Sequence, residues 1–201
     1  MQKMIIESIK VTRGVLDLVL ADSALIATVE QAGKLCVSAL QNKKKILLAG
    51  NGGSAADSQH IAAELVSRLN YDRPGLSAIA LTTDTSALTA IGNDYGFERA
   101  FARQLEAIGQ EGDVFFAIST SGNSANILAA LKSAKSRGIK TIGLTGKTGG
   151  KMAELCDIVI KIPSPCTPNI QECHIMFGHI ICQIIEDTMF GKEYGNKPKT
   201  A

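Results

Sequence analysis

The chain has 201 residues, of which 45% are hydrophobic and 20% are charged, and its formal net charge is +2. This length suits one domain that buries about 70% of its unfolded surface. The small net charge predicts no nucleic-acid partner, and the lack of a long apolar run or signal peptide predicts neither a secreted nor a membrane protein. The five cysteines never form a Cys-x-x-Cys pair, so we expect reduced thiols in a cytoplasmic protein.

The first forty residues predict two helices in a hairpin. Apolar side chains recur at helical spacing from about Lys3 to Leu40, and Asp22-Ser23 interrupts the pattern as a break and a cap. Because these apolar faces come before any strand, we expect part of this surface to pack on another subunit.

Five short apolar segments after residue 45 alternate with segments of helical periodicity. The expected strands are 46–49, 77–81, 114–118, 141–144 and 158–162, and the expected helices fall near 55–69, 85–91, 97–108, 125–137 and 170–190. This alternation predicts an α/β fold with a doubly wound, five-stranded parallel sheet covered by helices on both faces. We expect a single domain over residues 1–190 and a polar, mobile tail over 191–201.

The most informative stretch is Ser119-Thr120-Ser121-Gly122-Asn123-Ser124, which lies between the third strand and a helix. Free backbone N–H groups converge at such a helix N-terminus, where the helix dipole favours an anion. The alternative is a group of helix caps with no ligand. Four hydroxyls in six residues exceed what capping requires, so the sequence favours a phosphate site.

Two glycine-rich stretches resemble nucleotide-binding motifs, but each lacks residues that its motif requires. Gly50-Asn51-Gly52-Gly53-Ser54 lies at the carboxyl end of the first strand, where ligands bind in parallel sheets. However, Ala55 takes the third glycine position of the dinucleotide fingerprint, and no acidic residue ends the second strand. Gly146-Lys147-Thr148 resembles the end of a nucleotide phosphate loop, but Thr141 occupies the position where that motif requires its first glycine.

A candidate metal and acid–base site combines two helices that are far apart in the sequence. His60 and Glu64 are four residues apart and so share one helix face, and Gln171 and His179 lie on the last helix. Solvated helix faces are the alternative, but His179 lies in a strongly apolar run, and a buried histidine beside a carboxylate needs a partner or a metal. The four side chains would suit zinc or a similar divalent ion.

The spacing on the last helix adds a geometric constraint to this candidate site. Eight helical residues rise about 12 Å, so Gln171 and His179 of one straight helix could hardly reach one ion together. Either the helix bends, or the site is completed across a subunit interface, and we favour the interface.

With these motifs the chain resembles the sugar isomerase (SIS) family over about residues 43–190, and most closely its phosphoheptose isomerase branch. The motifs are the two stretches at residues 50–54 and 118–124, His60-x-x-x-Glu64, Gly92-Asn93-Asp94-Tyr95-Gly96-Phe97, Leu144-Thr145-Gly146 and Ile170-Gln171-Glu172. The resemblance implies a flavodoxin-like SIS fold, one zinc ion per subunit, and a homotetramer with active sites at subunit interfaces.

The resemblance also implies roles for the matching residues. The phosphate would be held by Ser119, Thr120, Ser121 and Ser124, and the sugar would be lined by Asn51, Gly52, Gly53, Asn93 and Asp94. Glu64 and Gln171 would also contact the substrate, and Arg68 the substrate or a neighbouring subunit. The zinc ligands would be His60, Glu64, Gln171 and His179, with Glu64 and His179 as the acid–base pair.

The implied reaction converts sedoheptulose 7-phosphate to D-glycero-D-manno-heptose 7-phosphate through an enediol, the first step of heptose biosynthesis for lipopolysaccharide core or another surface glycan. The alternative is a non-catalytic relative that binds the replication initiator protein, but that relative lacks the equivalents of Glu64 and His179. A second alternative is a sugar-phosphate-sensing regulator, but such regulators usually come attached to a DNA-binding domain, and we expect none here. The one departure is Asn169, where relatives often carry Arg, and it bears on substrate contacts from this loop.

Overall fold

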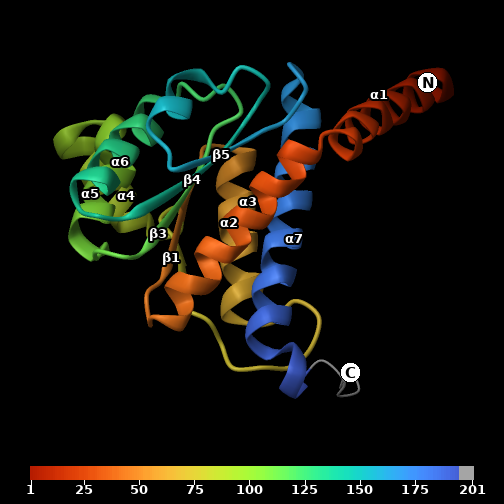
Figure 1. Ribbon diagram of the computed structural model, residues 1–201. Coiled ribbons are helices and arrows are strands. Elements are labelled where there is room, and N and C mark those ends of the chain that lie inside the picture. The colour runs from red at the N-terminus through yellow and green to blue at the C-terminus, as the bar shows by residue number, and fades with distance from the viewer. Residues whose placement is uncertain (195–201) are drawn as a thin grey trace.

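The computed structural model describes residues 1–194, without the side chain of Tyr194, and its centre is one parallel sheet (Figure 1). The strands are β1 (Ile46–Ala49), β2 (Ala78–Ala80), β3 (Val114–Ile118), β4 (Lys140–Thr145) and β5 (Ile158–Lys161). Their order is β2-β1-β3-β4-β5, so the chain moves outward from β1 in both directions. This confirms the predicted doubly wound fold and puts its switch point between β1 and β3.

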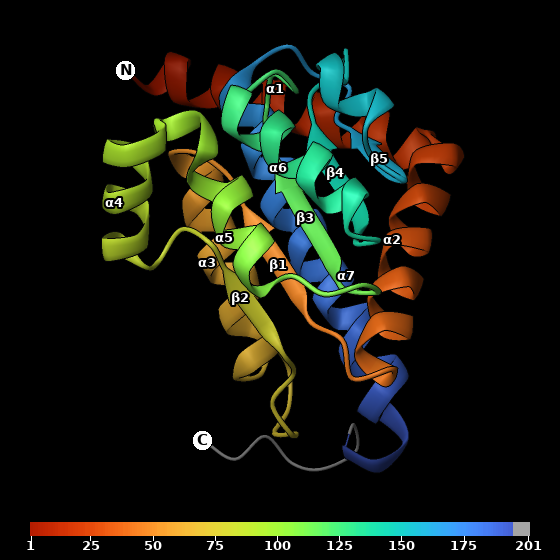
Figure 2. The ribbon, with the colours of Figure 1, turned by 90° about the vertical axis from the view of Figure 1, so that its left-hand side faces the viewer.

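Helices cover both faces of the sheet, as predicted. One face carries α2 (Ser23–Gln41), α3 (Gly53–Val66) and α7 (Thr167–Tyr194) (Figure 1). The other carries α5 (Ala100–Ile108) and α6 (Ala125–Ser136), with α4 (Thr85–Tyr95) beside them (Figure 2). Side chains of a strand alternate between the faces. Leu48 and Phe116 therefore belong to the core under α2, α3 and α7, whereas Leu47 and Phe115 belong to the core under α5 and α6.

The N-terminal hairpin consists of α1 (Gln2–Ala21) followed by α2. The Asp22 carboxylate accepts a hydrogen bond of 2.9 Å from the Leu25 amide, so Asp22 caps α2, as the sequence predicts. The first turns of α1 project away from the body (Figure 1), and only Val15 and Val19 of this helix are buried. Its exposed apolar side chains include Met4, Ile5, Ile6, Ile9, Val11, Leu18 and Leu20.

Helix boundaries differ from the prediction where tertiary contacts decide them. The expected helix over 97–108 is a 3-10 turn, η1 (Phe97–Arg99), followed by α5. Helix α3 ends at Val66 instead of residue 69. The amides of Leu69 and Asn70 donate to the buried Glu186 carboxylate, at 3.1 and 2.9 Å, and so leave the helical hydrogen-bond pattern.

The last helix is longer than the prediction of 170–190. It runs from Thr167 to Tyr194, so the first four residues of the expected tail are helical. The remaining tail, residues 195–201, lies outside the described residues, and the division into a domain over 1–190 and a tail stays a prediction. Within residues 1–194, no helix is both long and apolar enough to cross a membrane, and all five cysteines are free thiols.

Candidate active site

The predicted phosphate loop, Ser119–Ser124 (the serine loop), connects β3 to α6 at the switch point of the sheet. The hydroxyl oxygens of Ser119 and Ser124 lie 2.9 Å apart. Ser124 occupies the N-cap position of α6, yet its side chain accepts no capping hydrogen bond. Capping therefore does not account for this hydroxyl, whose hydrogen-bond partner is the Ser119 hydroxyl.

Gly122 fixes the shape of the serine loop. Its φ is +65°, and a Cβ at this position would lie 2.1 Å from the Gly149 carbonyl oxygen, so only glycine fits. The Asn123 side chain ties the loop to the 3-10 turn η2 (Gly150–Glu154) by accepting a 3.0 Å hydrogen bond from the Lys151 amide. The polar groups of this loop are thus held in place before any ligand arrives.

A hollow of about 400 Å³ borders Thr120 and Ser121 and is also lined by Lys147. The exposed ammonium group of Lys147 adds a cation beside the neutral hydroxyls, which favours an anion there. The sequence analysis mentioned Lys147 only as part of a nucleotide motif that it rejected, and did not predict that Lys147 lies near the serine loop. Its position beside the serine loop depends on β4 lying next to β3.

Asn51, expected to line the sugar, is paired with a residue that the sequence analysis missed. Its amide exchanges two hydrogen bonds with the amide of Asn126, at 2.9 and 2.8 Å. Asn126 is buried in the first turn of α6. The pair therefore joins the glycine-rich loop after β1 to the helix that the serine loop begins, and it holds the two loops together across the switch point.

His60, Glu64 and His179 form the second polar group of the site, here named the histidine cluster. Nε2 of His60 lies 2.8 Å from Nε2 of His179 and 3.2 Å from a carboxylate oxygen of Glu64. The candidate ligand atoms of the three residues all lie within 4.8 Å of one another. Two imidazoles and a carboxylate this close together can hold a divalent metal ion.

Helices α3 and α7 build this cluster because they run side by side in the same direction (Figure 1). Gly178 permits the close approach, since a Cβ there would lie 2.6 Å from the Ile61 side chain. One turn after His60, Glu64 lies on the same face of α3, and His179 follows Gly178 on α7. Two residues from one helix thus meet one residue from the other.

Gln171 lies on α7 next to the first turn of α3. Its amide nitrogen lies 2.5 Å from the place that a Cβ of Gly53 would occupy. Gly52, the N-cap residue of α3, has φ +56° and open space where a Cβ would lie. Among residues 1–194, no hydrogen bond joins Gln171 to the histidine cluster, so its role as a fourth ligand stays a prediction.

Asp57 is a further polar residue that the sequence analysis missed. It lies on α3 three residues before His60, and its Oδ2 is buried with no hydrogen-bond partner among the described residues. Burial raises the pKa of this carboxyl group, and the nearby His60 and His179 partly offset that rise. Its carboxylate can accept a hydrogen bond from water or from an imidazole N–H. The Asp57-x-x-His60 spacing, which places both residues on one helix face, could have indicated from the sequence that Asp57 lies near His60.

Three residues predicted to contact the substrate form no hydrogen bond or ion pair with the serine loop or the histidine cluster within residues 1–194. Asn93 and Asp94 are exposed at the end of α4, and the Asn93 amide donates to the Asp94 carboxylate at 2.8 Å. Arg68 is exposed just after α3, and no ion pair within residues 1–194 includes it. Their roles in substrate binding stay predictions.

Asn169 has a structural role in this chain. Its buried amide donates to the Thr12 hydroxyl at 3.0 Å and to the Glu172 carboxylate at 3.1 Å. These hydrogen bonds join α1 to the start of α7. The side chain that departs from the family pattern is therefore used to hold the N-terminal helix.

His174, the third histidine, stays outside the histidine cluster. It is fully buried, and neither ring nitrogen has a hydrogen-bond partner of good geometry in the described part of the chain. Burial lowers its pKa to about 4, against a smaller opposing effect of the Thr145 backbone. It is therefore a neutral core residue at pH 7.

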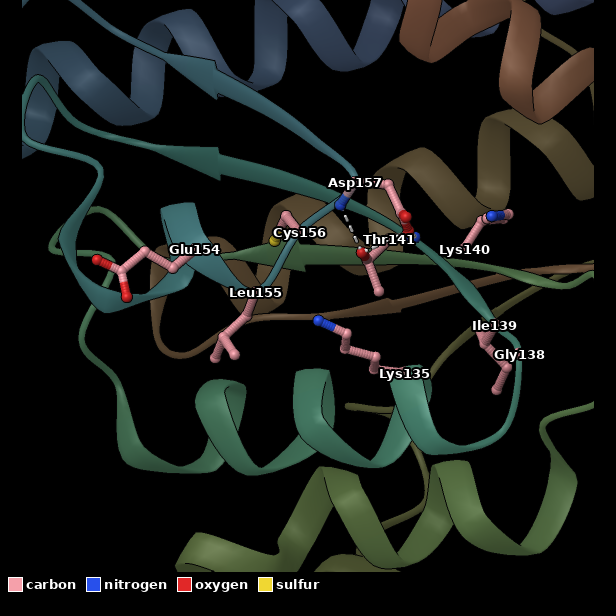
Figure 3. Close-up of a pocket in the computed structure, with 9 residues that line it drawn as sticks. All are labelled: Lys135, Gly138, Ile139, Lys140, Thr141, Glu154, Leu155, Cys156 and Asp157. Atoms are coloured by element: carbon pink, nitrogen blue, oxygen red, sulfur yellow. Dashed lines mark hydrogen bonds between the residues drawn. The ribbon is translucent and has the colours of Figure 1, made fainter.

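A separate cavity of about 200 Å³ lies at the amino ends of β4 and β5, and Figure 3 shows Lys135 extending into it from α6. The carboxylate of Asp157 there accepts hydrogen bonds of 2.8 and 2.9 Å from the amide and hydroxyl of Thr141. Burial raises the pKa of the Cys156 thiol to about 12, so that thiol stays protonated and unreactive. The serine loop is at the opposite, carboxyl ends of the strands.

Comparisons with known proteins identify the family of this chain. A family model described as SIS domain matches residues 15–146. The phosphoheptose isomerase of Aneurinibacillus thermoaerophilus is 60% identical over 176 residues, covering 88% of this chain and 89% of that protein. The one from Burkholderia pseudomallei (strain K96243) is 54% identical over 189 residues, covering 94% and 96%.

A solved structure gives the same result. The phosphoheptose isomerase of Neisseria gonorrhoeae superimposes with a TM-score of 0.87 at 44% identity, over 92% of this chain and 98% of that one. The chain therefore belongs to the SIS domain family and, within it, to the phosphoheptose isomerases, which are sugar-phosphate isomerases.

Proposed function

We propose that this enzyme converts sedoheptulose 7-phosphate to D-glycero-D-manno-heptose 7-phosphate. The observation that carries the proposal is the convergence of His60, Glu64 and His179, from two helices, with their candidate ligand atoms within 4.8 Å of one another. The chain also offers a candidate phosphate loop at the switch point of the sheet. Isomerisation of a phosphorylated sugar requires both a phosphate site and an acid–base site. The names of the relatives support a heptose phosphate as the substrate.

The serine loop would hold the phosphate through neutral donors. Ser119, Thr120, Ser121 and Ser124 present hydroxyls, and the N-terminus of α6 adds backbone N–H groups and a favourable dipole. The distal phosphate anchors the sugar, so binding energy far from the reacting carbons orients them. Asn51, Gly52, Gly53, Asn93, Asp94, Arg68 and Gln171 are the proposed further contacts.

Glu64 and His179 would be the acid–base pair. One of them removes a proton from C1 of the open-chain ketose while O2 gains a proton, which gives the enediol. A proton is then returned to C2 while the O1 hydroxyl loses its proton, so that the carbonyl moves from C2 to C1. Glu64 and His179 each lie close to His60, at 3.2 and 2.8 Å. Two ionisable groups held this near one point can both transfer protons to and from one substrate.

His60, Glu64 and His179, with Gln171, would hold one zinc ion per subunit. Imidazole nitrogens and a carboxylate are ordinary zinc ligands. When bound, zinc supplies electrostatic stabilisation of the negative charge that develops on the substrate oxygens. The alternative, a scaffold that binds the replication initiator, would have no need of the Glu64 and His179 that converge here.

We further propose that the enzyme is a cytoplasmic homotetramer with active sites at subunit interfaces. An apolar groove of about 510 Å³ runs between α1, α2 and α7, and its lining is almost entirely hydrophobic: Leu16, Val19, Leu20, Ile26, Val29, Glu30, Met176, Phe177, Ile180 and Ile184. Apolar surface of this kind supports contact with another copy. The heptose product would enter a surface glycan, such as the lipopolysaccharide core.

The test is turnover of sedoheptulose 7-phosphate by purified protein, after chelation and after zinc is added back. We expect zinc-dependent formation of the aldose and its loss in Glu64→Gln and in His179→Ala. His174→Leu is the matched control, because His174 is the histidine outside the cluster. No turnover by a folded, zinc-loaded tetramer would overturn the proposal.

A further inference from the structure

A buried ion pair closes the far end of α3 against α7. Nε of Arg73 lies 3.1 Å from a carboxylate oxygen of Glu186, and the two side chains are 1% and 0% exposed. Arg73 lies in the segment after α3, and Glu186 lies on α7, seven residues after His179. The pair is therefore two helical turns from the histidine cluster along α7.

Both partners of this pair also bind the backbone of α3 or of the segment after it. The Arg73 guanidinium donates to the Glu64 carbonyl at 2.8 Å and to the Leu65 carbonyl at 2.7 Å. The Glu186 carboxylate accepts from the amides of Leu69 and Asn70. Glu186 thus holds the chain after α3, and Arg73 holds the last turn of α3 itself.

These contacts fix the position of Glu64 relative to His179. Glu64 supplies a carboxylate to the histidine cluster, while its own carbonyl accepts from Arg73, which Glu186 of α7 holds in turn. Apolar packing, such as Gly178 against Ile61, contributes to the register of the two helices, and the ion pair adds directional polar contacts at the far end of α3. The planar Arg73 guanidinium donates from Nε to Glu186 and from its two terminal nitrogens to the Leu65 and Glu64 carbonyls, and this fixed geometry opposes sliding of one helix along the other.

We propose that Arg73 and Glu186 are a positioning pair, which sets the register of α3 on α7 and so holds Glu64 and His60 against His179. The inference rests on the proposed function, in which these three residues bind the metal and move the protons. Replacing both partners by apolar side chains leaves no buried charge unpaired, although it also frees the backbone groups that Arg73 and Glu186 bind. The role in positioning is therefore tested by measuring the geometry of the site as well as stability.

The test compares the wild-type protein with the double variant Arg73→Met/Glu186→Met. A metal-free readout is the nuclear Overhauser effect between the rings of His60 and His179, whose centroids are 5.0 Å apart. The chain has only three histidines, so selective labelling resolves them. We expect this effect to weaken severalfold, Co²⁺ affinity to fall about tenfold, and kcat to fall with KM unchanged.

Lys45→Met/Asp113→Leu is the matched control. It removes another ion pair with a fully buried carboxylate, whose Oδ2 lies 2.7 Å from Nζ of Lys45, at the amino end of the sheet. Ring contact and Co²⁺ affinity should stay at wild-type values in this control. If the Arg73/Glu186 variant does not fold, Arg73→Lys serves instead, because it keeps the charge and loses the planar fork.

The outcomes separate the inference from the proposed function. A folded variant that keeps both the ring contact and the Co²⁺ affinity overturns the inference, as does an equal loss in the control. A wild-type protein that binds no metal and turns over no heptose phosphate counts against the proposed function alone. The ring contact still tests the positioning pair in that case, because it needs neither metal nor substrate.

Discussion

The serine loop takes its polar groups from six consecutive residues, whereas the histidine cluster joins residues that are 119 positions apart in the chain. The loop is shaped by Gly122 in the left-handed region and by contacts with one neighbouring segment, in which Asn123 binds the Lys151 amide of η2. The cluster exists only because two long helices pack in one register. Changes to the loop should therefore act on binding of the phosphate, and changes between the helices on the metal and the chemistry.

The largest expected effect comes from His179→Ala, which removes the only member of the cluster that α7 supplies. We expect kcat to fall by about a thousandfold, because an acid–base group and a proposed metal ligand are lost together. Steady-state turnover of sedoheptulose 7-phosphate measures it. A kcat within tenfold of the wild-type value would contradict the assignment of the chemistry to the histidine cluster.

His174→Leu tests a histidine that belongs to neither group. Its folded pKa of about 4 lies below the ordinary 6.5, so the unfolded chain binds the proton more readily. This contribution to stability is complete above pH 6.5 and is lost as the pH falls toward 4, by about 3 kcal/mol. We expect urea unfolding of the variant to depend less on pH over this range, and a slope equal to that of the wild-type protein would contradict the assignment.

Ser119→Ala tests the serine loop directly. The loss of one hydrogen bond to a charged phosphate should raise KM by about tenfold. Both kcat at saturating substrate and Co²⁺ affinity should stay within about twofold of wild type, because the cluster is built from other elements. A large fall in Co²⁺ affinity would show that the two groups are not independent.

Gly178→Ala tests the contact between the helices, and we expect the smallest effect from it. The added methyl group meets the Ile61 side chain, which can shift in part, so unfolding free energy should fall by about 1 kcal/mol. Co²⁺ affinity should fall with it, while KM changes little. Gly14→Ala is the control, because a Cβ there meets nothing within 4 Å; equal results for both variants would exclude a role for the close approach.

Much of the fold could be predicted because it follows from local patterns. Apolar strand segments and the periodicity between them indicate the parallel sheet, and all five strands occur within two residues of their expected bounds. The boundaries that differed are those that distant residues decide. Glu186, for example, ends α3 early by taking the amides of Leu69 and Asn70.

The sequence by itself determined the serine loop and the pairing of His60 with Glu64, because neighbouring residues on a strand–helix junction or on one helix face have fixed relative positions. The sequence analysis named His179 as a partner of that pair, but only the tertiary structure brings the three together, buries Oδ2 of Asp57 and pairs Asn126 with Asn51. The tertiary structure also showed Arg73 and Glu186 closing the end of α3. The physical reason is that the register between two packed helices depends on side-chain contacts along their whole length, which no local pattern specifies.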